Sequence, residues 1–427
     1  MKTVLILAYD FPPLRSAGAQ RPASWYRHLH VSGWYPAVVT RHWDPGSEKP
    51  ENFVKSSNSK ILTKECTPSG SLIRVPYKAN FRDRMILKYG LTKFRFIRRM
   101  LSFIISVLRF YLPCADPSRA IYRSAAAYLD ENPADLIIAT GEPFILFKYA
   151  FLLSRKYKIP YLLDYRDAWN TGDRPDGSLA GKIIHFPLLF FLERKYFRHA
   201  IHVTTPARCY AEKLRRIHGG TEVSVIMNGF QAEALPPESP AATDNFTVIY
   251  SGKLYPWQPL EVFLSILDSW LEEHHIRDFS MLFIGTDTDG SVLRRFSQSK
   301  AFGSDRIQFT GRLDYYAYIR LLHSAHLLLL LSKPGHAWLN AKLFDYLAAG
   351  RPVLMFQGRE GEMETIIRSA NAGVVAGEKD EAVRVLDACY REYRANGNIA
   401  TKPIDIDQYS RERQCALLAE ILDRCVV

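Results

Sequence analysis

Cysteine is scarce in the sequence and never occurs in a paired motif. The six cysteines are Cys66, Cys114, Cys209, Cys389, Cys415 and Cys425. No two of them form a CxxC pair, which excludes a zinc ribbon and a thioredoxin-type redox site. In a chain of 427 residues, cysteines scattered in this way are expected to stay reduced, as in the cytoplasm.

A long apolar run is also missing. The most apolar stretch, "MLSFIISVLRFYL" from Met100 to Leu112, is shorter than the about 20 residues that a membrane-spanning helix needs, and it contains Arg109. The short apolar run at the start ends at Asp10 without a cleavage site, so no signal peptide is expected. These absences predict a cytoplasmic protein.

Acidic residues are outnumbered by basic ones, 44 to 56, which gives a net charge of +12 at pH 7. This balance favours anionic partners, such as nucleotides, nucleic acid or an anionic membrane face. The chain is too long for one compact core, and its hydrophobic fraction of 47% predicts folded domains, most simply two.

Short apolar runs alternate with longer amphipathic segments. The expected strands lie at residues 3–9, 35–40, 134–140, 160–165, 200–205, 246–252, 280–285, 307–311, 325–332 and 352–356. Continuous apolar runs are typical of parallel strands that are covered on both faces. With helices between them, they predict an α/β protein with doubly wound sheets.

A segment without periodicity divides the chain. Residues 231–245, "QAEALPPESPAATDN", are rich in Pro, Ala, Ser and acids, which is typical of a linker. We therefore predict one domain over 1–230, a second over 246–408, and a last helical segment over 409–427.

The loop after the first strand is the first candidate site. In "AYDFPPLRSAGAQRPASW", Gly18 allows the backbone to approach a ligand, and the helix that follows directs free N–H groups toward it. Arg15 and Arg21 add positive charge. Because the loop is neither a complete GxGxxG nor a Walker A motif, a tight turn without a ligand is an equal alternative.

Paired charges follow the strand at 160–165. The segment "LLDYRDAWN" contains Asp164, Arg166 and Asp167. Charges at the end of a buried strand are costly unless they pair or act in a site. A functional role is favoured over a purely structural Asp–Arg pair.

Two segments of the second half carry further candidates. In "SGKLYPWQP", Gly252 precedes Lys253, which can bind phosphate as a point charge or be a solvated lysine. In the segment from Ser332 to Phe356, Asn340 is expected to cap a helix on which Lys342 and Asp345 share a face. The Asp345 carboxylate suits a ribose diol. The alternative is an ordinary ion pair of Lys342 with Asp345 on the helix surface.

Two other stretches carry charged residues that allow more than one interpretation. "GTDTDG" has Asp287 and Asp289 in DxD spacing, but a glycine-rich turn is favoured over a metal site. Residues 82–112 interleave apolar residues with Arg82, Arg84, Lys88, Lys93, Arg95, Arg98, Arg99 and Arg109. This pattern favours a helix on an anionic membrane surface, ahead of a solvated face and of nucleic-acid binding.

Several segments together resemble the GT-B glycosyltransferases, in particular the retaining, GT4-like family and its polysaccharide-assembly members. They are "ILAYDFPPLRSAGAQRP", "YLLDYRDAW", "VIMNGF", "YSGKLYPWQ" and "AKLFDYLAAGRPVL". They occur in the family's order over nearly the whole chain. The resemblance implies two Rossmann-like domains facing a cleft, with a last helix that crosses back to the first domain.

The resemblance also implies a function. The chain would move a sugar from a nucleotide sugar, such as a UDP- or GDP-sugar, to a lipid-linked or surface-polysaccharide acceptor. It would retain the anomeric configuration and need neither metal nor cofactor. The expected location is the inner face of the cytoplasmic membrane, as a peripheral protein that does not bind nucleic acid.

Site roles are carried over by matching motifs. Lys253 stands where the family binds the donor phosphates, Asp345 where an acid binds the donor ribose, and Gly18 beside the phosphates. Arg166 and Asp167 stand at the catalytic loop, where many members have His-Asp. The remaining expected site residues are Gly252, Lys333, Asn340, Lys342 and Leu343 for the donor, and Arg15, Arg21 and Asp164 for the acceptor side.

Three positions depart from the family pattern. Ala337 replaces the first of two acids, Gln258 lies near a usual lysine, and Arg166 replaces a histidine. A guanidinium cannot act as a base. Two alternatives therefore stay open: a sugar-nucleotide epimerase on the same fold, and a non-catalytic protein that binds nucleotide or glycan.

Overall fold

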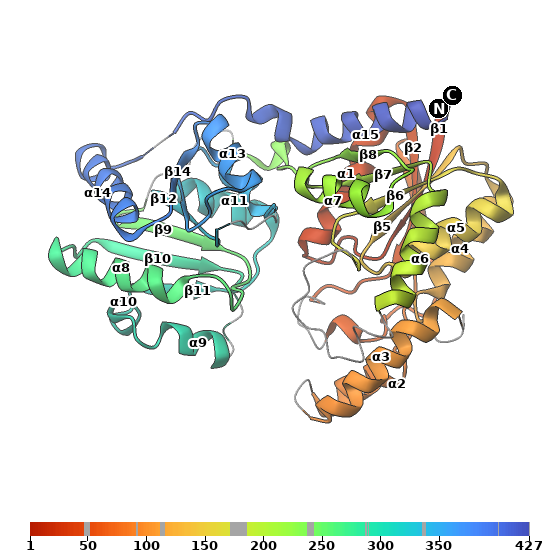
Figure 1. The fold of residues 1–427 in the computed structure, drawn as a ribbon, viewed down its shortest axis with the longest axis horizontal. Coiled ribbons are helices and arrows are strands. Elements are labelled where there is room, and N and C mark those ends of the chain that lie inside the picture. The colour runs from red at the N-terminus through yellow and green to blue at the C-terminus, as the bar shows by residue number, and fades with distance from the viewer. Residues whose placement is uncertain are drawn as a thin grey trace. The chain divides into compact units, whose positions relative to one another are not determined.

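The chain folds into two compact units (Figure 1). The computed structural model describes residues 1–46, 52–90, 93–111, 116–170, 186–236, 243–286, 288, 290–334, 339–399 and 401–426. The first unit is Met1–Met227 with Gln414–Val427, and the second is Asn228–Arg413. The described part of the predicted linker, 231–236 and 243–245, thus belongs to the second unit. The boundary between the units falls after Met227, just before the domain boundary predicted at residue 230.

The first unit is built on an eight-stranded sheet in the order β3-β4-β2-β1-β5-β6-β7-β8. The strands are β1 (Lys2–Ala8), β2 (Trp34–Arg41), β3 (Thr63–Thr67), β4 (Gly70–Val75), β5 (Leu136–Gly141), β6 (Tyr161–Tyr165), β7 (His202–Thr205) and β8 (Val223–Val225). The edge strand β3 is antiparallel to β4, and the other pairs are parallel.

Helices cover this sheet. They are α1 (Ala17–His28), α2 (Phe81–Tyr89), α3 (Arg95–Tyr111), α4 (Arg119–Glu131), α5 (Ile145–Tyr157), α6 (Phe186–His199) and α7 (Arg208–His218), with short 3-10 turns η1 (Leu29–Ser32) and η2 (Asn52–Val54). Side chains of β1 alternate between two cores: Leu5 joins one, and Val4 joins the other. This double coverage explains why the strand is apolar throughout.

The last helix, α15 (Arg411–Cys425), packs against the first unit. Its buried residues Cys415, Leu418 and Leu422 share a core with Val4 and Ile6 of β1. This is the arrangement of the final helix that the family resemblance implies.

The second unit has a six-stranded parallel sheet in the order β11-β10-β9-β12-β13-β14. Its strands are β9 (Phe246–Ser251), β10 (Phe279–Ile284), β11 (Ile307–Thr310), β12 (Leu327–Leu331), β13 (Val353–Phe356) and β14 (Gly373–Ala376). Its helices are α8 (Leu260–Glu273), α9 (Gly290–Phe296), α10 (Lys300–Gly303), α11 (Tyr315–Ser324), α12 (Lys342–Ala348), α13 (Glu362–Ser369) and α14 (Lys379–Asn396), with 3-10 turns η5 (Ala232–Ala234) and η6 (Ile406–Tyr409). The predicted α/β architecture with two doubly wound sheets is confirmed.

The second unit begins and ends on one short bridge. Phe230 pairs in parallel with Ser410. The Phe230 N–H donates to the Tyr409 carbonyl at 3.0 Å, and the Arg411 N–H donates to the Phe230 carbonyl at 2.8 Å. The segment that enters this unit and the segment that leaves it are therefore hydrogen-bonded to each other.

The strand orders locate one crevice position in each sheet. In the first sheet the chain order reverses between β1 and β5, and in the second between β9 and β12. In open α/β sheets, ligands bind beyond the carboxyl ends of the strands at such a switch point. The loops after these four strands are therefore where a site is expected.

Candidate functional site

Three lysines of the second unit gather around its switch point. Gly252 and Lys253 follow β9, Lys333 follows β12, and Lys342 begins α12. Gly252 has a φ of +87°, and a Cβ built on it would lie 3.5 Å from the Lys342 Nζ. Glycine therefore suits the backbone here because of its positive φ, and the lysine lies in ordinary van der Waals contact with this position.

Lys342 is enclosed at its charged end. Its Nζ donates a hydrogen bond to the Ser251 carbonyl and lies 3.9 Å from the centroid of the Tyr250 ring. Burial lowers the pKa of this ammonium group to about 7. Near neutral pH its charge is therefore sensitive to any anion bound nearby.

Asp345 lies one turn further along α12 and is 8% exposed. The Tyr315 hydroxyl donates to its Oδ1 at 2.6 Å. Burial raises the pKa of the carboxyl group to about 6, against the opposing effects of Arg411 and of hydrogen bonds from Tyr315 and Tyr318. Tyr315, Tyr318 and Arg411 were not identified from the sequence, because they lie at least 27 positions from Asp345 and carry no motif.

Two donor-side expectations need correction. Asn340 is not the cap of α12: the N-cap is Ala341, and no side chain caps the helix. The Asn340 carbonyl instead accepts from the Leu343 N–H at 3.1 Å. The Leu343 side chain is fully buried, so it packs in the core and is not available to a ligand.

Gln258 holds the loop after β9. It is 3% exposed; its Nε2 donates to the Leu331 carbonyl at 2.9 Å, and its Oε1 accepts from the Tyr255 N–H at 2.8 Å. An amide suits this position because it both donates and accepts. The residue near the family's usual lysine is thus structural here.

In the first unit, an ion pair covers Gly18. The Arg166 Nη2 donates to the Asp10 Oδ2 at 2.8 Å and to the Glu142 carbonyl at 2.8 Å. A Cβ on Gly18 would lie 1.9 Å from the Arg166 Nη1. The sequence predicted a small residue here for the donor phosphates; in the structure the guanidinium occupies that space. Gly18 also lies in the first turn of α1, capped by Ser16, and not in a loop.

The sequence assigned Arg21 and Asp164 to the acceptor side. In the structure they form a buried pair. They are 3% and 0% exposed and are joined by a 2.6 Å contact from Nη2 to Oδ1. Asp164 also accepts from the hydroxyls of Thr140 and Thr204, each at 2.8 Å. With the Arg21 Nη1 bonded to the Ile226 carbonyl, the pair is satisfied within the fold and links α1 to β6.

The catalytic-loop candidates lie between two anchors. Arg166 is fixed by Asp10, and the Asn170 N–H donates to the Glu193 Oε2 at 3.2 Å. Glu193 is fully buried. Asp167 lies between these anchors with an exposed carboxylate, and Arg15 is likewise exposed. Glu193 lies in no recognisable motif, and Asp10 lies in the loop after the first strand but was given no role from the sequence.

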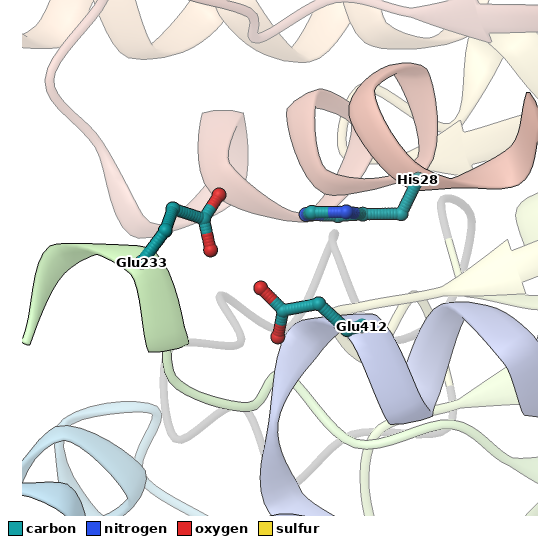
Figure 2. A group of neighbouring side chains, drawn as sticks. All are labelled: His28, Glu233 and Glu412. Atoms are coloured by element: carbon teal, nitrogen blue, oxygen red, sulfur yellow. The ribbon is translucent and has the colours of Figure 1, made fainter. Parts of the chain in front are cut away.

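A carboxyl pair lies where the second unit ends. Figure 2 shows Glu233 on η5 and Glu412 on the first turn of α15; His28, also labelled there, belongs to α1 of the first unit. Oxygens of the two carboxyl groups lie within 4.8 Å of each other. Burial, together with Glu233, raises the pKa of Glu412 to about 7. Two carboxyl groups this close favour one shared proton.

Some expectations fall outside the described residues. Asp287, Asp289 and Ala337 are among them. In the part of the chain that the structure describes, no helix has the combination of length and apolar character that a bilayer-spanning segment requires.

Comparisons with known proteins bear on the family and the fold of the chain. Residues 17–229 match the glycosyl transferase 4-like domain family, and a search of curated proteins gave no match. A glycosyltransferase from Rickettsia africae has a TM-score of 0.62 at 13% identity, with 99% of this chain and 98% of that chain covered. Sucrose-phosphate synthase from Thermosynechococcus elongatus has a TM-score of 0.61 at 15% identity, with 99% of this chain and 98% of that chain covered.

HepE from Anabaena in complex with UDP-glucose has a TM-score of 0.61 at 14% identity, with 99% of this chain and all of that chain covered. At these identities the likeness shows the shared fold alone. Its coverage extends over both units.

Proposed function

The chain belongs to the glycosyl transferase 4-like family and is a glycosyltransferase with the GT-B fold, and we propose that it transfers a sugar from a nucleotide-sugar donor to a lipid-linked or surface-polysaccharide acceptor. We further propose that transfer retains the anomeric configuration and needs no metal. HepE was solved with UDP-glucose, which supports a UDP- or GDP-sugar as the donor of this chain.

One observation carries the proposal: Lys253, Lys333 and Lys342 gather beside β9 and β12 at the switch point, with Asp345 one turn along α12. When the bond between sugar and nucleotide breaks, negative charge grows on the leaving diphosphate. Fixed cations at that position stabilise the charge and thereby lower the barrier. We assign to Asp345 the binding of the ribose hydroxyls.

The acceptor is assigned to the first unit. Arg166 remains charged and cannot take a proton; its contacts with Asp10 and the Glu142 carbonyl fix the start of the loop. We assign to the exposed Asp167 carboxylate the orientation of the acceptor hydroxyl. Retention follows if the acceptor attacks on the face that the leaving phosphate occupies.

The acceptor class is supported by a surface on α2 and α3. Their exposed apolar side chains, with that of Phe94 between them, are Phe81, Leu87, Tyr89, Phe94, Phe96, Ile97, Met100, Ile104, Leu108 and Tyr111. Exposed Arg84, Lys88 and Lys93 lie in the same segment. An apolar stripe beside basic groups suits the interface of an anionic membrane, where a lipid-linked acceptor resides.

The donor assignment is tested with Lys253→Ala. Loss of one cation at the leaving diphosphate should lower kcat by about 100-fold. Lys402→Ala is the matched control. This exposed lysine follows Thr401, whose N–H donates to the Gly350 carbonyl before β13, at the end of the sheet where the strands begin. If Lys253→Ala hydrolyses and transfers the donor at the wild-type rate, the phosphate assignment is wrong.

Metal independence has its own measurement. Transfer should continue at an unchanged rate after treatment with EDTA, because lysines supply the charge that a metal would otherwise supply. A rate that collapses with EDTA and returns with Mg²⁺ or Mn²⁺ would contradict the proposal.

Product analysis separates the alternatives. A transferase forms a glycosylated acceptor from donor and lipid extract. An epimerase would convert the nucleotide sugar without an acceptor, and a non-catalytic binding protein would give thermal stabilisation by nucleotide sugars without turnover.

A further inference from the structure

Two stacked aromatic rings are exposed on the loop after β9. The centroids of Tyr255 and Trp257 are 5.8 Å apart, and the rings are inclined by 14°. The residues are 43% and 37% exposed. On the same loop, Leu254 and Gln258 are each 3% exposed, so the loop directs its aromatic residues outward and its anchors inward.

The loop is held firmly on both sides of Trp257. The Gln258 side chain bonds to the Tyr255 N–H and to the carbonyl of Leu331 at the end of β12. Arg295 of α9 donates to the Tyr255 carbonyl at 2.9 Å and to the Gln258 carbonyl at 2.6 Å. Aromatic surfaces that are held in place before binding lose little conformational entropy when a ligand arrives.

An ammonium group lies beside each ring. The Lys253 Nζ is 5.7 Å from the centroid of Tyr255, and the Lys333 Nζ is 5.8 Å from that of Trp257. These lysines follow the two neighbouring strands at the switch point. Ammonium groups bind phosphate, and exposed aromatic faces stack on flat rings. A ligand that carries both a phosphate and a ring would use all four side chains.

We propose that Tyr255 and Trp257 form a stacking subsite for the ring of a phosphate-bearing ligand whose phosphate is bound by Lys253 and Lys333. The proposal rests on the proposed function, which supplies two ligands of this chemistry. One is the base of the nucleotide donor, and the other is the sugar of a phosphate-linked acceptor.

The experiment compares the full-length chain with Trp257→Ala and Trp257→Phe. Tyr316→Ala is the control, because Tyr316 is a 55% exposed tyrosine on α11 of the same unit. Calorimetric titrations use UDP, GDP and inorganic pyrophosphate. Transfer assays measure the KM for a sugar linked through diphosphate to a short alkyl chain.

We expect Trp257→Ala to lower the affinity for one ring-bearing ligand by about tenfold and to leave the affinity for pyrophosphate unchanged. Trp257→Phe should restore most of the loss, and Tyr316→Ala should have no effect. A weaker Kd for UDP or GDP assigns the subsite to the base, and a raised acceptor KM alone assigns it to the acceptor sugar.

The proposal is overturned if every Kd and KM of Trp257→Ala stays within about twofold of the wild type. It is also overturned if pyrophosphate and UDP weaken equally, since the effect would then not depend on a ring. A wild-type chain that binds no nucleotide and transfers no sugar would instead contradict the proposed function.

Discussion

The Arg166 guanidinium occupies the space that a side chain at position 18 would need. A methyl group on Gly18 would lie 1.9 Å from the Arg166 Nη1 and 2.8 Å from the Asp10 Oδ2. Because Arg166 is also bonded to the Glu142 carbonyl, the guanidinium cannot shift without breaking a contact. We therefore expect Gly18→Ala to displace Arg166 and to lower kcat by about tenfold or more, with a loss of about 1–3 kcal/mol in the free energy of unfolding.

Steady-state kinetics and urea unfolding check this expectation. Gly303→Ala serves as the control, since a Cβ there meets nothing within 4 Å. An unchanged kcat in Gly18→Ala would show that the Arg166–Asp10 pair has no part in positioning the loop.

Asp345 should make donor binding depend on pH. Its pKa is raised from 3.8 to about 6. An ionised carboxylate accepts hydrogen bonds from both ribose hydroxyls, so UDP affinity should rise through about pH 6. Above about pH 7 the loss of the Lys342 charge should lower it again. Calorimetric titration from about pH 5 to about pH 8 measures both limbs, and Asp345→Asn should remove the rise. A flat profile in the wild type would refute the assignment.

The same shift predicts an effect on the free protein. Between pH 3.8 and about 6 the folded state keeps a proton on Asp345 that the unfolded state loses. The contribution of Asp345 to the free energy of unfolding is therefore largest below pH 3.8 and falls as the pH rises from 3.8 to about 6. Asp345→Asn should remove this fall, and urea unfolding at several pH values measures it.

Residue contacts were predictable from the sequence only where they are local. Lys342 and Asp345 share a helix, and Gly252 and Lys253 come directly after β9, a strand that the apolar pattern predicts. The contact of Asp10 with Arg166 joins residues 156 positions apart. It depends on which strands are neighbours in the sheet, and motif spacing does not give that order. For this reason the sequence assigned Gly18 to the donor and Arg21 to the acceptor.

At the scale of elements, α3 gives the clearest test of the membrane proposal. Phe96, Met100, Ile104 and Leu108 follow one another at four-residue intervals and are all exposed, so they lie along one face of the helix. We expect the chain to sediment with vesicles that contain phosphatidylglycerol and to bind less to vesicles of phosphatidylcholine alone.

Substitution of the stripe should remove this binding. Phe96→Glu with Ile104→Glu places two charges on the apolar face and should abolish sedimentation while leaving binding of UDP unchanged. Val31→Glu, at a 78% exposed position of the first unit, is the matched control. Equal sedimentation of both variants would count against the proposed surface.

Among the strands that the sequence did not predict, β3, β8 and β14 are short or polar, whereas β4 has six residues and is mostly buried. Strand β3 reads "TKECT" and is mostly exposed, and β8 and β14 have three and four residues. Such segments lack the apolar run that predicts the long central strands. Helix α8, by contrast, has apolar residues that recur at helical spacing, and seven of them are buried.

At the scale of the whole molecule, α15 makes the stability of the first unit depend on the far end of the chain. Leu418 is fully buried in the core that contains β1. We expect Leu418→Ala to lower the free energy of unfolding by about 2–5 kcal/mol. Hydrogen exchange should quicken in peptides of β1 and β2 and stay unchanged in β9 and β12.

Glu420→Ala tests whether this effect comes from burial. Glu420 is an exposed residue on the same helix, and its replacement should change the free energy of unfolding by less than about 0.5 kcal/mol. Faster exchange in the second unit of Leu418→Ala would show that the helix does not belong to the first unit alone.

The bridge between Phe230 and Ser410 makes residues 228–413 a cassette. Both cuts needed to remove this unit fall beside one pair of hydrogen-bonded segments, so a replacement whose own ends meet could be joined at the same two points. The first unit would keep its sheet and α15 from Gln414 onward. Chimeras of this kind would pair one acceptor half with different donor halves, and the sugar transferred would then show which half selects it.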